Sequence, residues 1–324
     1  MNKIQRYLDS NVFYFNQIII KQTYFIKIMD TQNSIKKLNI PQINFREGGS
    51  IPLIGFGTYL MRGQECKKAV EHAILSGYTQ IDTAAMYGNE QDIAEVIHSK
   101  KLNIQREDLF ITSKVNYNEQ GYENAKKSVQ QMLKRLKVNY LDCVLIHWPG
   151  VSHLDDDDPK NATVRTETWK ALIELKKQGI IKHIGVSNFN INHLEHLISN
   201  SEYVPEMNQF EIHPLCHDLK LVKYCQDKGI IVQAYCPLAR NHKKVITNKL
   251  ILELANKYKK SIAQILLRWG FQNNYVIIPK SKTPKYIEEN LQILDFQFTQ
   301  DEMNKLNQLN CNLHVDWDPI CIKY

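Results

Sequence analysis

The chain is 324 residues long and 43% hydrophobic, which is enough to bury a full core in two domains or in one large barrel. Its basic residues exceed its acidic ones by seven, but no basic run is interleaved with aromatic residues, so no nucleic-acid partner is expected. The seven cysteines form no C-x-x-C pair, which predicts reduced thiols in a cytoplasmic protein and neither disulfides nor a zinc site.

Residues 1–40 are predicted to be an extension that need not fold with the following domain. The segment "NVFYFNQIII" (11–20) is apolar, but two polar residues interrupt it, Lys21 ends it, and no small-residue cleavage site follows. Neither a membrane-spanning helix nor a secretory signal is therefore expected. An upstream start, with Met29 as an alternative first residue, is the favoured interpretation, and basic residues near the start leave organellar targeting open.

From residue 51 onward, short β-rich segments recur and are separated by stretches with helical patterns. The eight predicted strands are 51–59, 78–84, 109–115, 140–148, 183–189, 206–212, 230–238 and 275–281. Between them, residues 124–136 have apolar positions every three or four residues, and Ser261 is placed to cap a helix at 261–271.

This alternation of strands and helices predicts a single α/β domain over 41–324. The strands are near-continuous apolar runs, which is typical of parallel strands buried on both faces and favours a closed (β/α)8 TIM barrel. The alternative is an open doubly wound sheet, which requires a glycine-rich phosphate turn, and "GFGTYL" (55–60) does not match G-x-G-x-x-G. The segment "INFREGGSIPL" (43–53), with its turn at Gly48 and Gly49, predicts a β-hairpin that plugs the bottom of the barrel.

Four titratable residues stand at the ends of consecutive predicted strands, where barrel enzymes place their chemistry. They are Asp82, Tyr87, Lys114 and His147. An ion pair between Lys114 and Asp82 is expected to lower the pKa of Tyr87 from about 10 and make it a proton donor near neutral pH. His147 is expected to orient a carbonyl oxygen. Each residue alone has a simpler explanation, such as a helix cap or a solvent-facing lysine, but the set favours catalysis.

The motifs around these residues resemble those of the aldo-keto reductase family, from about Ile43 to the C-terminus. The segment "GYTQIDTAAMYGNEQDIA" (77–94) is similar to the first family signature with three departures, and "IELKKQGIIKHIGVSNF" (173–189) is similar to the second. The segments "ITSKV" and "LIHWPG" carry the family lysine and histidine. The resemblance implies NAD(P)H-dependent reduction of an aldehyde or ketone to an alcohol, with Tyr87 as the proton donor.

The resemblance also implies a nicotinamide cofactor site. Ser187, Asn188 and Gln209 would hold the carboxamide, and Tyr235 would stack on the ring. The other implied cofactor contacts are Leu238, Lys280, Ser281, Lys282, Tyr286, Glu289 and Asn290.

Tyr286 stands where the family has an arginine that contacts the adenosine 2′-phosphate. A phenol cannot replace the bidentate grip of a guanidinium, although Lys282 and Lys285 are close enough in sequence to compensate. The expected cofactor is therefore NADPH, with NADH accepted more readily than in relatives that carry the arginine.

The implied substrate pocket consists of Tyr59, Asn116, His147 and Trp148, and Asn116 replaces a common tryptophan, which makes the wall more polar. The expected partner is a small carbonyl compound, and the acidic run 155–158 would disfavour anionic ones if it overhangs the barrel mouth. We expect a monomer with no membrane partner.

No metal site is expected from the sequence. His193 and His196 are three residues apart but have no third ligand near them, so they are interpreted as surface or interface histidines. The alternative function is a non-catalytic, redox-sensing auxiliary subunit that binds NADP(H) on the same fold, and the intact set of four residues favours an enzyme.

Overall fold

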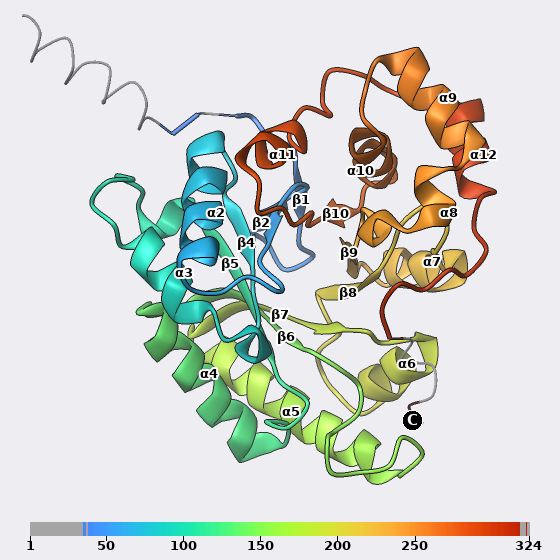
Figure 1. Ribbon diagram of the computed structural model, residues 1–324. Coiled ribbons are helices and arrows are strands. Elements are labelled where there is room, and N and C mark those ends of the chain that lie inside the picture. Colours follow the sequence, from blue (N-terminus) through green and yellow to red (C-terminus); the bar gives the residue numbers. More distant parts are fainter. Residues whose placement is uncertain (1–34, 37, 318–321, 323–324) are drawn as a thin grey trace, which may run out of the picture.

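The protein is described here by a computed structural model that covers residues 35–36, 38–317 and 322 (Figure 1). Eight strands lie in sequence order in one sheet, and every neighbouring pair is parallel. These strands are β3 (Phe56–Gly57), β4 (Gln80–Asp82), β5 (Phe110–Val115), β6 (Leu141–Ile146), β7 (Ile181–Ser187), β8 (Met207–Glu211), β9 (Ile231–Tyr235) and β10 (Val276–Ile277). Each falls within or overlaps a segment predicted from the sequence.

The two ends of this sheet meet and close the barrel. Ile54 forms a parallel bridge with Ile277. The backbone N–H of Ile277 donates to the oxygen of Leu53 at 2.9 Å, and that of Gly55 donates to the oxygen of Ile277 at 2.9 Å. The (β/α)8 barrel prediction is therefore confirmed.

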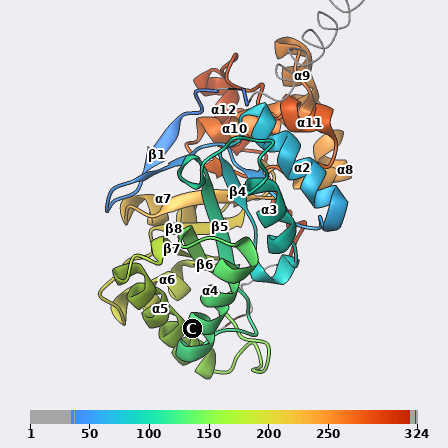
Figure 2. The same cartoon turned by 90° about the vertical axis from the view of Figure 1, so that its left-hand side faces the viewer.

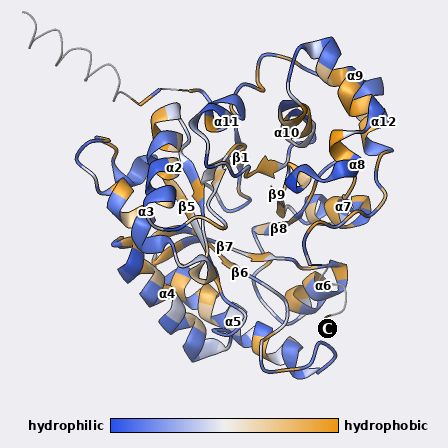
Figure 3. Ribbon diagram, in the orientation of Figure 1, coloured by the Kyte–Doolittle hydropathy of each residue, from blue (hydrophilic) through white to orange (hydrophobic). Residues whose placement is uncertain are grey.

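Helices surround the barrel, and the apolar colouring concentrates on the strands and the inward faces of the helices (Figure 3). They are α2 (Gly63–Ser76), α3 (Glu90–Ile97), α4 (Tyr122–Leu136), α5 (Lys160–Lys177), α6 (Ile191–Ser199), α7 (Leu219–Asp227), α8 (Lys243–Ile246), α9 (Lys249–Tyr258), α10 (Ile262–Gln272), α11 (Pro284–Glu289) and α12 (Gln300–Asn307). The described residues also form the short 3-10 helices η1 (Ala85–Tyr87), η2 (Arg106–Asp108) and η3 (Ala239–Asn241). The predicted helix at 124–136 is α4, and Ser261 caps α10 by accepting from the backbone N–H of Gln264.

An N-terminal hairpin covers one end of the barrel, where Figure 2 shows β1 at the edge of the molecule. Its strands are β1 (Gln42–Asn44) and β2 (Ser50–Pro52), which pair antiparallel. Gly48 and Gly49 both have positive φ, 94° and 77°, as the tight turn requires. The hairpin prediction is confirmed, but the predicted strand 51–59 is divided between β2 and β3, because its first residues pair within the hairpin.

The hairpin fills the lower half of the barrel with apolar side chains. Phe45 and Ile51 pack there against Leu145, Met207 and Ile231, and all five are buried. Burial of such side chains contributes roughly 1.5–3 kcal/mol each. The ring of His183 stacks on Phe45 at 3.7 Å between centroids, and its Nδ1 contacts the buried carboxylate of Glu206 at 2.8 Å, so this polar pair beside the layer is internally satisfied.

Residues 1–34 and 37 lie outside the described part, so most of the predicted extension is not covered. Within the covered part, Ile40 is buried and the backbone N–H of Lys36 donates to the oxygen of Leu75 in α2 at 3.0 Å. Packing therefore begins before residue 41. No helix in the described ranges is long and apolar enough to cross a membrane. The six cysteines within those ranges are free thiols, and Cys321 lies outside them.

Candidate active site

Consecutive strands bring the four predicted catalytic residues together at the C-terminal end of the barrel. Asp82 ends β4, Tyr87 ends the short helix η1, Lys114 lies near the end of β5, and His147 follows β6. The rings of Tyr87 and His147 are 5.8 Å apart between centroids. The sequence prediction that these residues surround one mouth agrees with this geometry.

Lys114 is completely buried, and its ammonium group has three acceptors around it. Its Nζ donates to Asp82 Oδ1 at 2.5 Å, to the backbone oxygen of Thr83 at 3.0 Å and to the phenolic oxygen of Tyr87 at 3.4 Å. The second carboxylate oxygen of Asp82 accepts from Gln209 Nε2 at 2.8 Å. A buried charge is tolerated only with such pairing, so this network fixes the lysine beside the phenol.

The expectation that Lys114 lowers the pKa of Tyr87 is not met. Enclosure of the phenol raises the pKa of Tyr87 well above 10, and the negative charge of Asp82 raises it further. The lysine cation does not offset this because it is paired with Asp82, which lies closer than the phenol. Tyr87 is therefore a neutral phenol at physiological pH, which is the form that can donate a proton.

His147 is buried, and this burial together with the Lys114 cation lowers the pKa of its imidazole well below 6.5. It is thus a neutral ring at neutral pH. Its backbone oxygen accepts from Asn188 Nδ2 at 3.0 Å, which ties the end of β6 to the residue that follows β7. A neutral imidazole can hydrogen-bond a carbonyl oxygen without adding charge to the site.

A buried asparagine that sequence reasoning missed holds the loop that carries Tyr87. Asn89 precedes α3, and its Nδ2 donates to the backbone oxygens of Thr58 at 2.9 Å and Met61 at 3.0 Å, while its Oδ1 accepts from Thr83 Oγ1 at 2.6 Å. Arg62 Nε also donates to the backbone oxygen of Tyr87 at 2.7 Å. Nothing in the local sequence distinguishes Asn89 from an ordinary helix cap.

A cavity of about 380 Å³ opens above these residues. Residues from both the predicted catalytic and the predicted cofactor sets line it. They are Asp82, Tyr87, His147, Ser187, Asn188, Gln209, Tyr235, Leu238 and Lys280, together with the predicted substrate residues Tyr59 and Trp148. The apolar and aromatic lining with a few converging polar groups is typical of a small-molecule site.

The residues predicted to hold a carboxamide form one connected group in this cavity. Asn188 Oδ1 accepts from the hydroxyl of Tyr235 at 2.8 Å, and Ser187 Oγ donates to the backbone oxygen of Gln209 at 2.8 Å. Asn188 has a φ of 65°, in the left-handed region that asparagine adopts more readily than most other non-glycine residues.

Apart from Lys280, the residues predicted to contact the adenosine end are not part of the cavity lining. Lys282 is half exposed and pairs with Glu65 of α2 at 2.8 Å, and Tyr286 in α11 is 52% exposed. Ser281 contacts Thr283. The backbone oxygen of Glu289 accepts from Gln264, and Asn290 is buried. These residues follow Lys280 along the chain, so they extend from the cavity edge along α11.

A second hollow, of about 350 Å³, adjoins the first and shares Met86 and Trp148 with it. Tyr117 and Asp156 line it. Asn116, which was predicted to line the substrate pocket, lines neither hollow, and its Oδ1 accepts from the backbone N–H of Tyr117 at 2.8 Å. One member of the acidic run 155–158 therefore does reach the barrel mouth. Asn116 is not where the pocket prediction placed it, because its side chain caps its own loop.

The C-terminal tail (311–317), which the sequence indicates as part of the substrate pocket, contributes one residue to each hollow. Asp316 lines the first, and its carboxylate pairs with Arg240 of η3 at 2.5 Å, while Trp317 lines the second and lies 4.7 Å from Trp148 between ring centroids. In Figure 1 the segment after α12 runs back along the barrel towards α6. The particular contacts of Asp316 and Trp317 are not predicted by any local pattern, because they join residues far apart in the sequence.

The prediction that His193 is a surface or interface histidine is wrong. His193 is buried; its Nε2 contacts the backbone oxygen of Ile322 at 2.8 Å, and its ring also contributes to the capping box of α6. It is therefore an internal contact for the chain end.

Known proteins match this chain over most of its length. The model of the aldo/keto reductase family matches residues 53–311. A Bacillus subtilis oxidoreductase of uncharacterized activity is 42% identical over 84% of this chain and 94% of its own length, and a glyoxal reductase of the same organism is 39% identical over 86% and 95%. A Bombyx mori aldo-keto reductase solved in complex with NADP superposes with a TM-score of 0.77 at 33% identity, covering 86% of this chain and 95% of that one.

The closed parallel barrel and the residues at its mouth define an oxidoreductase of the α/β-barrel class. Within that class, the chain belongs to the aldo/keto reductase family. The resemblance inferred from the signature motifs is thereby confirmed.

Proposed function

We propose that the protein reduces a small aldehyde or ketone to an alcohol with NADPH, and that Tyr87 donates the proton. The observation that carries this proposal is the buried contact of Lys114 with both Asp82 and Tyr87. When bound, a reduced nicotinamide supplies the hydride that the reaction needs.

The residues of the chain are assigned three tasks in this reaction. The neutral phenol of Tyr87 protonates the carbonyl oxygen, and His147 on the same cavity wall hydrogen-bonds that oxygen and orients it. As the phenol loses its proton, the ammonium of Lys114 stabilises the developing phenolate, and Asp82 holds the ammonium in place. Water is limited by the aromatic walls of Trp148 and Tyr59.

The chemistry of the cavity fits a nicotinamide carboxamide. Both amide hydrogens of Gln209 are used, because its Nε2 donates to Asp82 at 2.8 Å and to Gln233 Oε1 at 2.6 Å. Gln209 therefore offers its amide oxygen to the cavity, as an acceptor for a carboxamide N–H. Tyr235 lines the same cavity and provides a flat ring for stacking.

The residues at the predicted adenosine end of the cofactor site support a limited preference for NADPH over NADH. Lys280 lines the cavity edge and presents a cation to a phosphate, and burial together with Lys282 lowers the pKa of its ammonium. Lys282 must give up its pairing with Glu65 before it can reach a 2′-phosphate, and Tyr286 offers no charge. The compensation for the missing arginine is thus partial.

The substrate class follows from the two hollows and from the relatives. Neutral aldehydes, ketones and small dicarbonyl compounds suit aromatic walls to which Asp316 in the first hollow and Asp156 in the second add negative charge. One of the relatives is a glyoxal reductase, and others are methylglyoxal reductases of Escherichia coli and Yersinia pestis. The monomeric state and the cytoplasmic location stay predictions.

The direct test is loss of absorbance at the reduced nicotinamide band, with NADPH or NADH, across glyoxal, methylglyoxal and a panel of neutral aldehydes, ketones and sugars. We expect turnover with several small aldehydes and faster turnover with NADPH than with NADH. Tight NADPH binding without turnover of any carbonyl compound would instead favour the redox-sensing auxiliary subunit.

A further inference from the structure

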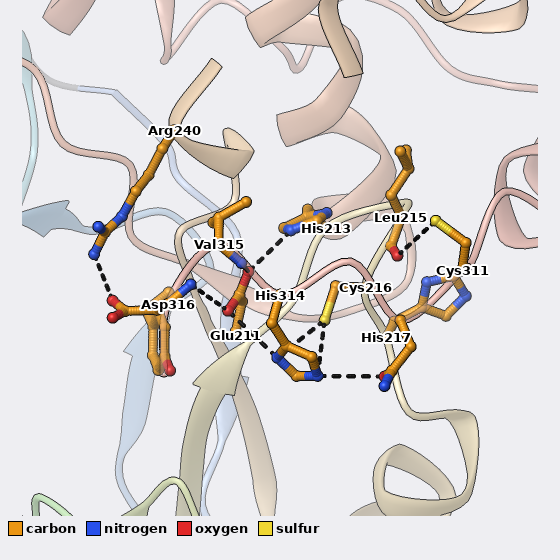
Figure 4. A network of polar contacts seen from close by, with 12 residues as sticks. Glu211, His213, Leu215, Cys216, His217, Arg240, Cys311, His314, Val315 and Asp316 are labelled. Atoms are coloured by element: carbon orange, nitrogen blue, oxygen red, sulfur yellow. Dashed lines mark hydrogen bonds and ion pairs between the residues drawn. The ribbon is translucent and has the colours of Figure 1, made fainter. Parts of the chain in front are cut away.

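A second cluster of polar side chains lies outside the cavity, between the end of β8 and the C-terminal tail (Figure 4). Glu211, His213 and Cys216 are buried, and each places a metal-binding atom within 4.8 Å of the others. His314 of the tail lies next to two of these three residues, with its Nδ1 3.5 Å from Glu211 Oε2 and 3.6 Å from Cys216 Sγ. The proposed mechanism uses none of these four residues.

We propose that Glu211, His213, Cys216 and His314 form a binding site for a divalent zinc ion. In a tetrahedral zinc site with bonds of about 2.0–2.3 Å, neighbouring ligand atoms are about 3.3–3.6 Å apart. The measured separations are 3.1 Å from His213 Nε2 to Glu211 Oε1, and 3.5 and 3.6 Å from His314 to Glu211 and Cys216. One thiol, two imidazoles and one carboxylate favour zinc over calcium or magnesium, which prefer oxygen ligands.

The backbone holds the first three ligands in place without a metal. His213 and Cys216 form an antiparallel bridge in which each backbone N–H donates to the other's oxygen at 2.9 Å. Glu211 ends β8, two residues earlier, so the three side chains leave one tight turn. A prearranged site loses little conformational entropy when the ion binds.

The tail is docked onto the same turn, which places its histidine. The backbone N–H groups of Cys311 and Leu313 both donate to the oxygen of Leu215, at 3.1 and 3.0 Å. The backbone N–H groups of Val315 and Asp316 donate to the two carboxylate oxygens of Glu211, at 2.8 and 3.1 Å. His314 lies between these contacts, and 27% of its side chain is exposed, which leaves an entry path for an ion.

An ion at this site would join the tail to the barrel wall beside the cavity. Asp316, two residues after His314, lines the cavity and pairs with Arg240. Zinc would therefore hold the tail residues that line the active-site cavity, without itself contacting the reacting groups. This inference departs from the sequence expectation of no metal site, which rested on the absence of closely spaced ligand motifs.

The test uses the full-length, metal-free protein under reducing conditions and Co²⁺ as a spectroscopic probe for zinc. We expect one equivalent of Co²⁺ to give the intense visible bands of tetrahedral cobalt and a near-ultraviolet thiolate-to-cobalt band, and Zn²⁺ to displace it. Cys216→Ser should abolish the thiolate band, and His314→Ala should weaken binding at least tenfold. No activity measurement is involved, so the result is independent of the proposed function.

The matched control is Cys311→Ser, which removes an exposed thiol of the same tail that contacts only the backbone oxygen of Leu215 among described residues. Its spectrum should equal that of the wild type, and circular dichroism should show all variants folded. If Cys216→Ser does not fold, His314→Ala decides, since it alters only the tail. The proposal is overturned if Co²⁺ gives only the weak spectrum of an octahedral ion, if the thiolate band survives Cys216→Ser, or if His314→Ala binds like the wild type.

Discussion

Substitution of Lys114 by methionine should destabilise the fold more than any surface change, because it leaves a buried carboxylate without its cation. Lys114 is completely buried and Asp82 is 2% exposed, and their charged atoms are 2.5 Å apart. In Lys114→Met the carboxylate keeps a donor from Gln209, but it loses the ion pair. Breaking a buried pair from one side costs about 3–5 kcal/mol, and we expect a loss of that size in the free energy of unfolding.

The companion variant Lys114→Met/Asp82→Asn removes both charges while keeping an oxygen that can accept from Gln209. We expect it to lose only about 1–3 kcal/mol, the cost of leaving the Thr83 oxygen unpaired. Both variants should be inactive. The assay is reversible urea unfolding followed by tryptophan fluorescence, at unchanged m-value. The argument that Lys114 and Asp82 form a buried ion pair would be refuted if the single variant lost less than about 1 kcal/mol of unfolding free energy. It would also be refuted if the double variant were as unstable as the single one.

Three further predictions address the histidine, the cofactor and the substrate. Because burial and the Lys114 cation lower the pKa of His147, its imidazole resonances should not shift between about pH 5 and pH 8, and a titration centred near 6.5 would contradict the neutral-ring assignment. Tyr286→Arg should tighten NADPH about tenfold or more and leave NADH little changed, as measured by fluorescence quenching; no gain would mean that Lys282 already fills the role or that the adenosine binds elsewhere. Asp156→Asn should raise kcat/KM for a keto acid relative to its amide, more at low salt than at high salt, and an equal ratio in both proteins would make the acidic run a solvated loop.

The sequence predicts the barrel well because its signals are local. Each apolar run is long enough to mark a parallel strand, and the signature around Asp82 lies within one strand and its loop. The division of 51–59 between β2 and β3 was not predictable in this way, because Ile51 pairs with Ile43 of the hairpin while Phe56 joins the barrel wall.

The features that sequence reasoning missed depend on contacts between distant segments. The raised pKa of Tyr87 comes from enclosure in the folded cavity, which no strand-end rule describes. Asp316 reaches the cavity and Trp317 the second hollow because the tail folds back onto Leu215 and Glu211. Glu211 and His213 are close in sequence to Cys216, but the approach of His314, about a hundred positions later, follows only from the fold.

The most direct test of the proposed chemistry is a single-turnover comparison of the wild type with Tyr87→Phe, each premixed with NADPH and then with an aldehyde. The substitution removes only the phenolic oxygen, so we expect NADPH affinity to change less than about threefold, while the rate of carbonyl reduction falls at least a hundredfold. The account is contradicted if Tyr87→Phe keeps more than about a tenth of the wild-type rate, a loss of less than ~1.4 kcal/mol of transition-state stabilisation.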